Sequence, residues 1–386
     1  MRKRIISIGL AICLLLGLTP GAWAVGLEVA APSAILMDAA TGTILWEKDA
    51  HTRLAPASVT KIMTLLLVLE ALDSGKIGWD DTVTTSDAAA AKGGSQVYLE
   101  PGEQLPLRDM LKAVVVSSAN DCATALAEHV AGSEAAFVEL MNQRAAELGM
   151  QETHFVNCTG LDDEPDAAEH LTSAYDIAVM SRQLLQHEEI RQYTTIWMDT
   201  VRDGQFGLSN TNKLIRFYQG ATGLKTGYTS AAGHCLSASA QRNGIELIAV
   251  VLHCASSADR FTAAKALLDY GFANYALVQL ETDGITPLPV KLGVCETVQP
   301  VPATDQPILI DKSLQASVTQ RVELETGLIA PIEAGQVLGQ LIVESGEQEL
   351  ARVELVAEAA VPRQSLWQIL GRLLRHLCLN GREAEN

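Results

Sequence analysis

Three short motifs in this chain carry residues that could act together in nucleophilic catalysis. They occur in the order Ser58-Val59-Thr60-Lys61, Ser118-Ala119-Asn120 and Lys225-Thr226-Gly227. Each motif alone is common by chance. Together they supply a serine nucleophile, a lysine base, a second hydroxyl with an amide, and a lysine-threonine pair suited to a carboxylate. The combination predicts a catalytic apparatus.

Ser58 and Lys61 are three residues apart at the start of a predicted helix, so their side chains lie on one face within hydrogen-bonding reach. A serine hydroxyl needs a base to attack, and a lysine serves as that base only when its ammonium form is disfavoured. Burial among apolar residues and the positive end of the helix dipole both have that effect. We therefore expect a neutral Lys61. The alternative is that Ser58 only caps the helix.

Ser118 and Asn120 lie between an apolar segment and a predicted helix. A second hydroxyl beside the first pair could pass a proton to a leaving amine. The Asn120 amide could donate to a substrate carbonyl and accept from a substrate N–H. The alternative for either residue is ordinary helix capping.

Lys225 and Thr226 lie in a predicted strand and could hold a terminal carboxylate, while Gly227 lets another backbone approach closely. The alternative for Lys225 is an exposed turn. An extended peptide could add to the edge of this strand. The backbone N–H groups of Ser58 and Tyr228 are the candidates for an oxyanion hole.

The elements that must position these motifs follow from periodicity and turn signals. We expect a hairpin over 33–49 at a sheet edge, a helix over 58–72, and a helical subdomain over 107–185 with breaks at Gly132, Gly149 and an acidic loop over 162–165. We also expect strands over 235–240 and 245–252 joined by a turn at Asn243-Gly244, and a helix over 260–270. From 282 to 361, short aliphatic stretches alternate with prolines and glycines, which predicts a small all-β domain.

The tail from 363 to 379 predicts an amphipathic helix. Basic residues lie off its apolar face, and on a protein this acidic they favour docking on an anionic membrane surface. The alternative is packing against its own domain. The apolar face holds Leu366, Trp367, Leu370, Leu373, Leu374 and Leu377.

The N-terminus has the pattern of a secretory signal. Basic residues at 2–4 precede an apolar run over 5–18, and Ala22-Trp23-Ala24 fits a cleavage site near Ala24. The alternative is an uncleaved anchor helix. The mature protein is therefore expected outside the cytoplasm. Asn157-Cys158-Thr159 matches a glycosylation pattern, which is weak evidence for an exported protein.

The amino-acid composition limits the kinds of molecule that this protein is expected to bind. The 386 residues are 48% hydrophobic and 19% charged, which indicates a globular protein, and a net charge of -18 argues against nucleic acid. The six cysteines that follow the signal are scattered without a metal-binding spacing, so no metal or cofactor is expected and buried thiols are favoured.

The motifs and their surroundings, Pro56 to Thr64, Ser118 to Asp121 and Gly223 to Thr229, resemble the low-molecular-mass penicillin-binding D-alanyl-D-alanine carboxypeptidases, serine peptidases related to β-lactamases. The resemblance implies an α+β fold. The chain would begin with a signal peptide over 1–24, followed by a transpeptidase-like catalytic domain over 25–280. That domain would have an antiparallel sheet, flanking helices and a helical subdomain. A small all-β domain over 281–361 and an anchor helix and tail over 362–386 would follow.

The resemblance also implies a bacterial cell-wall enzyme that removes the last D-alanine from peptidoglycan stem peptides ending in D-Ala-D-Ala. Ser58 would form the acyl-enzyme, Lys61 would act as base and Ser118 would relay protons. The enzyme would work at the outer face of the cytoplasmic membrane, and penicillins would acylate the same serine.

In the same resemblance, Asn120, Lys225 and Thr226 would hold the substrate. The residue after Lys-Thr-Gly is often histidine in the family. Here it is Tyr228, so only a backbone role carries over to this position.

Three other functions compete with this interpretation. A class A β-lactamase needs a Glu-x-x-Leu-Asn segment, and residues 139–142 lack the leucine at the right place. A non-catalytic wall-binding module would not need both Ser58 and Lys61. A related endopeptidase that cuts crosslinks would use the same apparatus.

Overall fold

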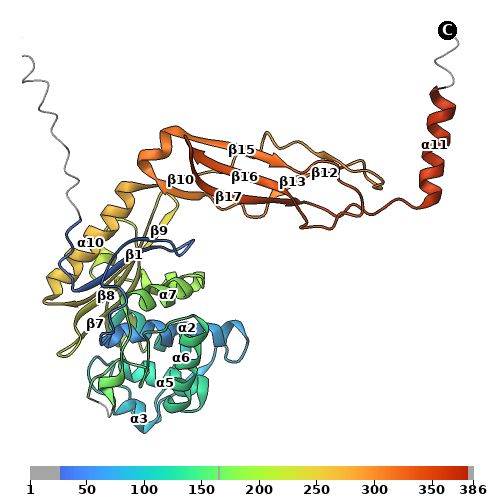
Figure 1. Ribbon diagram of the computed structural model, residues 1–386. Coiled ribbons are helices and arrows are strands. Elements are labelled where there is room, and N and C mark those ends of the chain that lie inside the picture. Colours follow the sequence, from blue (N-terminus) through green and yellow to red (C-terminus); the bar gives the residue numbers. More distant parts are fainter. Residues whose placement is uncertain (1–26, 164–165, 381–386) are drawn as a thin grey trace, which may run out of the picture.

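The computed structural model describes residues 27–163 and 166–380, so the predicted signal peptide lies outside the described residues. Its centre is a five-stranded antiparallel sheet in the order β2-β1-β9-β8-β7 (Figure 1). The strands are β1 (Ser33–Asp38), β2 (Ile44–Lys48), β7 (Ala221–Thr229), β8 (Gly233–Arg242) and β9 (Ile245–Cys254).

Two hairpins expected from the sequence are present in this sheet. The first hairpin pairs β1 with β2 at one edge, as predicted. The second joins β8 to β9 through Asn243 and Gly244, whose φ angles of 51° and 83° are those of a type I′ turn. The opposite edge of the sheet is β7, which carries Lys225, Thr226 and Gly227.

The two faces of the sheet are covered by different helices, because successive strand residues point to opposite faces. Ala34 and Leu36 of β1 pack into a core with α10 (Ser257–Asn274). Ile35 and Met37 pack into a larger core with α2 (Lys61–Asp73) and α7 (Ala174–Leu185).

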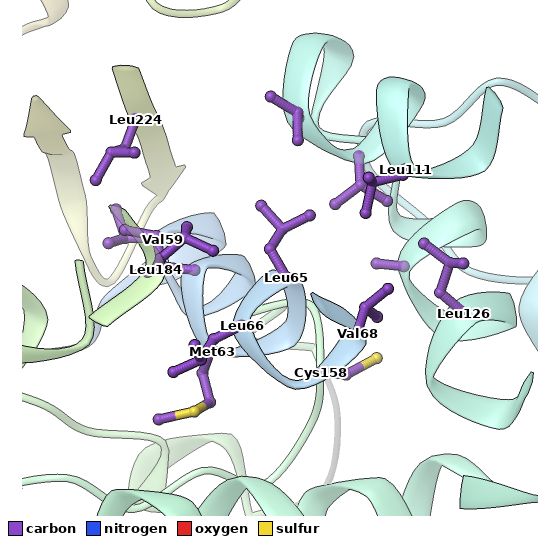
Figure 2. Close-up of a cluster of buried hydrophobic side chains, with 14 of the residues drawn as sticks. Val59, Met63, Leu65, Leu66, Val68, Leu111, Leu126, Cys158, Leu184 and Leu224 are labelled. Carbon is purple, nitrogen blue, oxygen red and sulfur yellow. The ribbon is translucent and has the colours of Figure 1, made fainter. Parts of the chain in front are cut away.

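Helix α2 lies at the centre of that larger core and is buried on nearly all sides. Figure 2 shows Leu65 and Val68 on the side that faces Leu111 and Leu126 of the neighbouring helices. Most positions of α2 are apolar, as expected for a helix that is buried on nearly all sides. The surrounding helices are α4 (Leu107–Ser117), α5 (Asn120–Ala131) and α6 (Glu134–Glu147).

The helical prediction over 107–185 is confirmed for α4 to α7, and the breaks expected at Gly132 and Gly149 follow the ends of α5 and α6. The non-helical segment between α6 and α7 is longer than the break expected over 162–165. That segment is a long loop with one short turn of 3-10 helix, and it is tied to the rest by isolated bridges of Leu54 with Thr172 and His154 with Leu171. The smaller elements of the catalytic region are η1 (Ala57–Thr60), β3 (Thr82–Thr84), α3 (Asp87–Ala90), β4 (Gln104–Pro106), η2 (Ala167–Glu169), η3 (Glu188–Ile190), α8 (Arg191–Thr194), β5 (Met198–Val201), β6 (Phe206–Ser209) and α9 (Leu214–Phe217).

A separate β-domain follows α10, with a four-stranded sheet in the order β13-β17-β16-β15 and small cores of its own. Its first strand, β10, begins at Tyr275, before the expected boundary, and pairs with β14. The strands are β10 (Tyr275–Val278), β11 (Leu288–Pro289), β12 (Thr297–Val298), β13 (Pro300–Pro302), β14 (Ile308–Asp311), β15 (Val318–Leu324), β16 (Val337–Ser345) and β17 (Gln348–Ala357), with the 3-10 helix η4 (Lys312–Ser317) between β14 and β15.

Helix α11 (Leu366–Asn380) ends the described chain, beyond the end of the β-domain that lies farthest from the catalytic region (Figure 1). Four of the predicted apolar positions, Leu366, Trp367, Leu370 and Leu374, are exposed. These four side chains do not pack against the β-domain, whereas Arg372 of the same helix pairs with Glu296. Within the described residues, no helix has both the length and the hydropathy to cross a bilayer.

Candidate active site

Ser58 and Lys61 lie side by side at the junction of η1 and α2. The Lys61 Nζ lies 3.0 Å from the Ser58 Oγ and donates a hydrogen bond of 2.7 Å to the carbonyl oxygen of Thr159. Ser58 is not the N-cap residue of either helix, so the capping alternative is wrong. Because the Thr159 carbonyl takes one N–H, a neutral Lys61 amine can aim its lone pair at the serine.

Burial controls the charge of Lys61. Its side chain is fully buried, and this desolvation lowers the pKa of Lys61 to about 7, against weaker raising effects of Cys158 and Asp121. Burial and the Glu134 carboxylate hold the pKa of Cys158 well above its usual range, so that thiol stays neutral. The Asp121 carboxylate accepts hydrogen bonds from the backbone N–H groups of Val97 and Leu99. The neutral amine and the ammonium form of Lys61 are therefore present in comparable amounts at pH 7, and the neutral amine dominates above that pH.

The turn that presents Ser58 is held in an uncommon conformation. Ala57 has a φ of 49°, in the left-handed region that L-residues seldom adopt. Its carbonyl oxygen accepts a 2.8 Å hydrogen bond from the Thr60 hydroxyl, which lies 2.7 Å from the His170 Nε2. Gly160 presses against the same carbonyl, since a Cβ at this glycine would lie 1.9 Å from the oxygen.

His170 in this arrangement is neutral, because burial lowers the pKa of its ring to about 4. Its Nδ1 accepts a hydrogen bond from the Val156 backbone N–H, so Nε2 carries the proton and donates to Thr60. Residues from the loop before α7 thus fix the backbone that carries the serine.

Gly227 of β7 lies directly against the turn that carries Ser58. A Cβ at this glycine would lie 2.7 Å from the Pro56 carbonyl oxygen and 3.1 Å from the Ser58 nitrogen. The close backbone approach expected of Gly227 is therefore present. The edge strand β7 and the backbone N–H of Ser58 therefore lie next to each other.

Ser118 and Asn120 lie at the junction of α4 and α5. Ser118 is buried and left-handed, with a φ of 64°, at the C-terminal end of α4. Asn120 is buried in the first turn of α5, and its Nδ2 donates a 2.7 Å hydrogen bond to the Gly93 carbonyl. Its Oδ1 has no hydrogen-bond partner within the described part of the chain. Neither side chain caps α5, whose N-cap is Ala119.

Lys225 and Thr226 are also buried, which rules out an exposed turn. The Lys225 Nζ donates to the Thr226 carbonyl at 2.9 Å, and the Thr226 hydroxyl donates to Thr211 at 2.7 Å. Desolvation, followed by the positive charges of Lys61 and Arg260, holds the pKa of Lys225 well below its usual range. An anion bound here would restore the ammonium form.

Tyr228 follows on the same strand, and its side chain is exposed. Its ring stacks on His234 of β8, with the ring centroids 4.3 Å apart. The phenol thus packs at the surface, while the backbone of Tyr228 continues β7 beside the Ser58 turn.

The first and third motifs meet where Gly227 packs against the Ser58 turn, and Asp121, next to the second motif, lies close enough for its charge to act on Lys61. Known proteins can be compared with this arrangement. Residues 21–256, more than half of the chain, match the family described as D-alanyl-D-alanine carboxypeptidase. The chain belongs to this family.

Relatives of the D-alanyl-D-alanine carboxypeptidase family extend the match beyond the catalytic region. Residues 281–363 match the C-terminal domain of penicillin-binding protein 5. D-alanyl-D-alanine carboxypeptidase DacF of Bacillus subtilis is 38% identical over 385 residues, which cover 96% of this chain and 98% of that protein. The resemblance noted in the motifs is confirmed, and the chain is a serine-type peptidase.

Solved structures agree with this assignment. Penicillin-binding protein 5 from Haemophilus influenzae has a TM-score of 0.76 at 32% identity, covering 87% of this chain and 98% of its own. Penicillin-binding protein D2 from Listeria monocytogenes, in an ampicillin-bound form, has a TM-score of 0.58 at 32% identity, covering 64% of this chain and 99% of its own. The expected transpeptidase-like domain followed by a small all-β domain is therefore confirmed.

The motifs of the carboxypeptidase family do not include every residue that shapes the site. The Thr159 carbonyl, Gly160 and His170 come from the loop between α6 and α7. Arg260 of α10 is buried under β7, where its Nη1 donates to the Gly227 carbonyl at 2.9 Å and its Nε has no partner within the described residues. It adds a buried guanidinium beside the buried amino groups of Lys61 and Lys225.

Asn157 was matched by a glycosylation pattern, and that interpretation is wrong. The side chain is fully buried. Its Oδ1 accepts hydrogen bonds from the backbone N–H groups of Thr159 and Gly160, and its Nδ2 donates to the Leu161 carbonyl. Asn157 therefore shapes the turn whose carbonyl binds Lys61. An asparagine followed three residues later by a glycine is a turn signal that could have been read from the sequence.

Proposed function

We propose that this enzyme removes the terminal D-alanine from peptidoglycan stem peptides through an acyl-enzyme on Ser58. The observation that carries the proposal is the fully buried Lys61, whose Nζ lies 3.0 Å from the Ser58 Oγ and whose pKa is lowered by burial to about 7. A base of that pKa, beside a hydroxyl, suits nucleophilic catalysis near neutral pH.

In the first half-reaction, neutral Lys61 takes the Ser58 proton while the serine oxygen bonds to the carbonyl carbon of the penultimate D-alanine. The oxyanion that forms accepts hydrogen bonds from the backbone N–H groups of Ser58 and Tyr228. Closeness of Gly227 to the Ser58 nitrogen supports this pair of donors. Collapse of the intermediate breaks the C–N bond, and Ser118 passes the proton to the departing amine of D-alanine.

In the second half-reaction, water attacks the Ser58 ester, Lys61 takes a proton from the water, and the shortened peptide leaves as its carboxylic acid. Ser58 regains its proton through Lys61, so the enzyme returns to its first state. The step needs no cofactor, because the ammonium and the backbone N–H groups supply the charge stabilisation.

The buried Lys225 and Arg260 side chains suit a substrate that ends in a carboxylate, because the anion would favour the ammonium form of Lys225. Lys225 and Thr226 would bind that carboxylate at the edge strand β7, and Arg260 would add positive potential from below. The unpartnered Asn120 Oδ1 would accept a substrate N–H. Because β7 is an edge strand, the peptide would add to it in extended form.

Penicillins would acylate the same serine, as the ampicillin-bound form of the Listeria protein suggests for a relative. Slow release of hydrolysed penicillin is expected, because Glu139, the glutamate of the partial match to the β-lactamase segment, is exposed on α6. Rapid turnover of penicillin would favour a β-lactamase instead.

The activity is tested by incubating the purified enzyme with a diacetylated Lys-D-Ala-D-Ala tripeptide and measuring free D-alanine. Release of D-alanine supports the carboxypeptidase, and its absence would overturn it. A crosslinked dimeric muropeptide in a parallel assay detects the endopeptidase alternative. If the protein is inactive in both assays but still binds cell walls, the non-catalytic binding module is supported instead.

The enzyme would act outside the cytoplasm. We assign residues 1–24 to a cleaved signal, 25–280 to the catalytic domain, 281–361 to the β-domain and 362–386 to a membrane anchor. The exposed face of α11, with Trp367 82% exposed, supports peripheral attachment to the outer face of the cytoplasmic membrane.

Removing residues 363–386 is expected to free the protein from membranes without loss of D-alanine release. The reason is that the exposed apolar residues of α11 lie outside the catalytic region. Sedimentation with membranes, followed by the tripeptide assay on both fractions, measures the two properties. A truncated protein that still sediments contradicts the anchor.

Gly160→Ala is expected to slow acylation by fluorescent penicillin at least about 100-fold and to lower the free energy of unfolding by about 3 kcal/mol. The new Cβ would collide with the Ala57 carbonyl and displace the turn that carries Ser58. Gly149→Ala is the matched control, since Gly149 also has a positive φ of 74° but no heavy atom within 4 Å of its Cβ. Equal acylation rates in the two variants would show that the contact with Ala57 has no role.

A further inference from the structure

The exposed large hydrophobic side chains of the β-domain gather at one end. Between residues 281 and 361, they are Leu292 (39% exposed), Val294 (48%), Ile329 (56%) and Val337 (38%). Leu292 and Val294 lie in the loop between β11 and β12, and Ile329 lies in the loop between β15 and β16. We call the loops 290–296 and 327–332 the tip. Contiguous apolar surface on a soluble domain marks an interaction site.

The two loops of the tip are joined by backbone hydrogen bonds. The Lys291 N–H donates to the Leu328 carbonyl at 2.9 Å, and the Ala330 N–H donates to the Lys291 carbonyl at 2.9 Å. Lys291 and Ile329 form a parallel bridge. Leu292 and Ile329 therefore belong to one continuous surface.

The tip is also fastened to the segment that leads into α11. The Val294 N–H donates to the Pro362 carbonyl at 2.9 Å, and the Gln364 N–H donates to the Leu292 carbonyl at 2.8 Å. Glu296 forms an ion pair with Arg372 of α11. The segment that leads into α11 therefore starts at the tip, and the ion pair joins the helix to it.

The opposite end of the β-domain has a different surface. There η4 approaches α10 of the catalytic domain, and the Ser317 and Ser345 hydroxyls pair beside the turn that joins β16 to β17. The exposed residues around that turn, at 346–349, are glycine, glutamate and glutamine. Within the described β-domain, the exposed large apolar residues therefore lie only at the end next to α11.

We propose that the tip is a second membrane-contact surface, which enters the interfacial region of the bilayer beside α11. The inference rests on the proposed attachment of α11 and adds a further contact to it. Lys291 and Arg363 are exposed here, but so are Glu325 and Glu333 on the neighbouring loop. The contact therefore depends on burial of Leu292, Val294 and Ile329 rather than on anionic headgroups.

Two contacts with the membrane restrict the orientation of the β-domain more than a single helix on a flexible linker does. With both the tip and α11 at the bilayer, the β-domain stands on the membrane by one end. The catalytic domain lies at the other end of the β-domain (Figure 1), so the cleft is held away from the surface.

Cys295 provides a direct test, because it is exposed in the tip while the other described free cysteines, Cys122, Cys158, Cys235 and Cys254, are buried. The mature chain, residues 25–386, with Cys378→Ser is labelled at Cys295 with an environment-sensitive fluorophore. It is then mixed with phosphatidylcholine vesicles, with and without phosphatidylglycerol, that carry a quencher near the headgroup. The emission is expected to shift to the blue and to be quenched on both vesicles.

A label on the Glu347→Cys variant, made with Cys295→Ser and Cys378→Ser, is the control at the opposite end of the β-domain and should remain in water. If the chain binds vesicles through residues 363–386 while Cys295 stays in water, the tip proposal is overturned and the anchor stands. If the chain binds no vesicle, both the tip and the anchor are overturned.

A second measurement uses unlabelled protein. Leu292→Glu combined with Ile329→Glu is expected to lower the vesicle partition coefficient about tenfold. Thr319→Glu combined with Gln348→Glu adds the same charge elsewhere on the β-domain and should leave it unchanged. Both proteins should keep the melting temperature and the D-alanine release of the parent. Equal partition of both variants and the parent would contradict the contact.

Discussion

Ser58→Ala is expected to abolish labelling by fluorescent penicillin and to reduce D-alanine release at least about 10⁴-fold. The hydroxyl is the only atom group removed, and in the proposed reaction it forms the bond to the acyl group. The fold should survive, because Ser58 is partly exposed and caps neither helix. The measurement is the rate of D-alanine release together with gel detection of the labelled protein.

Ser74→Ala is the matched control for this variant. Ser74 is exposed at the C-terminal end of the same helix, where its hydroxyl donates a 3.1 Å hydrogen bond to the Ala71 carbonyl. Its loss should leave labelling and release unchanged. Labelling of the Ser58→Ala protein at the parental rate would contradict the assignment of Ser58 as the nucleophile.

Lys61→Arg is expected to lose acylation by at least about 10³-fold at every pH between about 6 and 9. A guanidinium stays protonated throughout this range, so it cannot take the serine proton. The exposed Lys76, just beyond the same helix, offers the control Lys76→Arg, which should behave as the parent.

The parent enzyme should also show a pH profile set by Lys61. Burial lowers the pKa of Lys61 to about 7, so the ammonium form dominates below that pH and has no lone pair for the proton. The acylation rate constant at low penicillin concentration should therefore rise with pH and level off above about pH 8. A flat profile, or an active Lys61→Arg protein, would show that another group is the base.

Local sequence patterns were sufficient for the elements that present the motifs. The three-residue spacing of Ser58 and Lys61 placed them one turn apart, and Asn243-Gly244 gave the turn between β8 and β9. The burial of Lys61 could be expected from the aliphatic residues that follow it. The exposed Tyr228 also matches the expectation that its backbone alone carries over from the family.

Other parts of the site depend on contacts between distant segments. Lys61 and Thr159 are 98 residues apart, and Arg260 and Gly227 are 33 apart. No local pattern pairs such residues, since the partner in each case is a backbone carbonyl that any residue type could supply. Breaks at Gly149 and over 162–165 were expected, but not that the whole interval between α6 and α7 lacks an α-helix, with a turn at Asn157 and Gly160.

The enclosure of α2 has a consequence for how the enzyme fails on heating. Ten of its side chains, from Lys61 to Leu72, are buried, so its amide hydrogens can exchange with solvent only when the surrounding domain opens as a whole. The reactive amine of Lys61 therefore lies on a segment whose amides are expected to exchange slowly. Loss of activity on heating should therefore coincide with global unfolding of the domain. Substitutions that adapt the activity to another temperature would have to lie at the edge of the active site, outside α2.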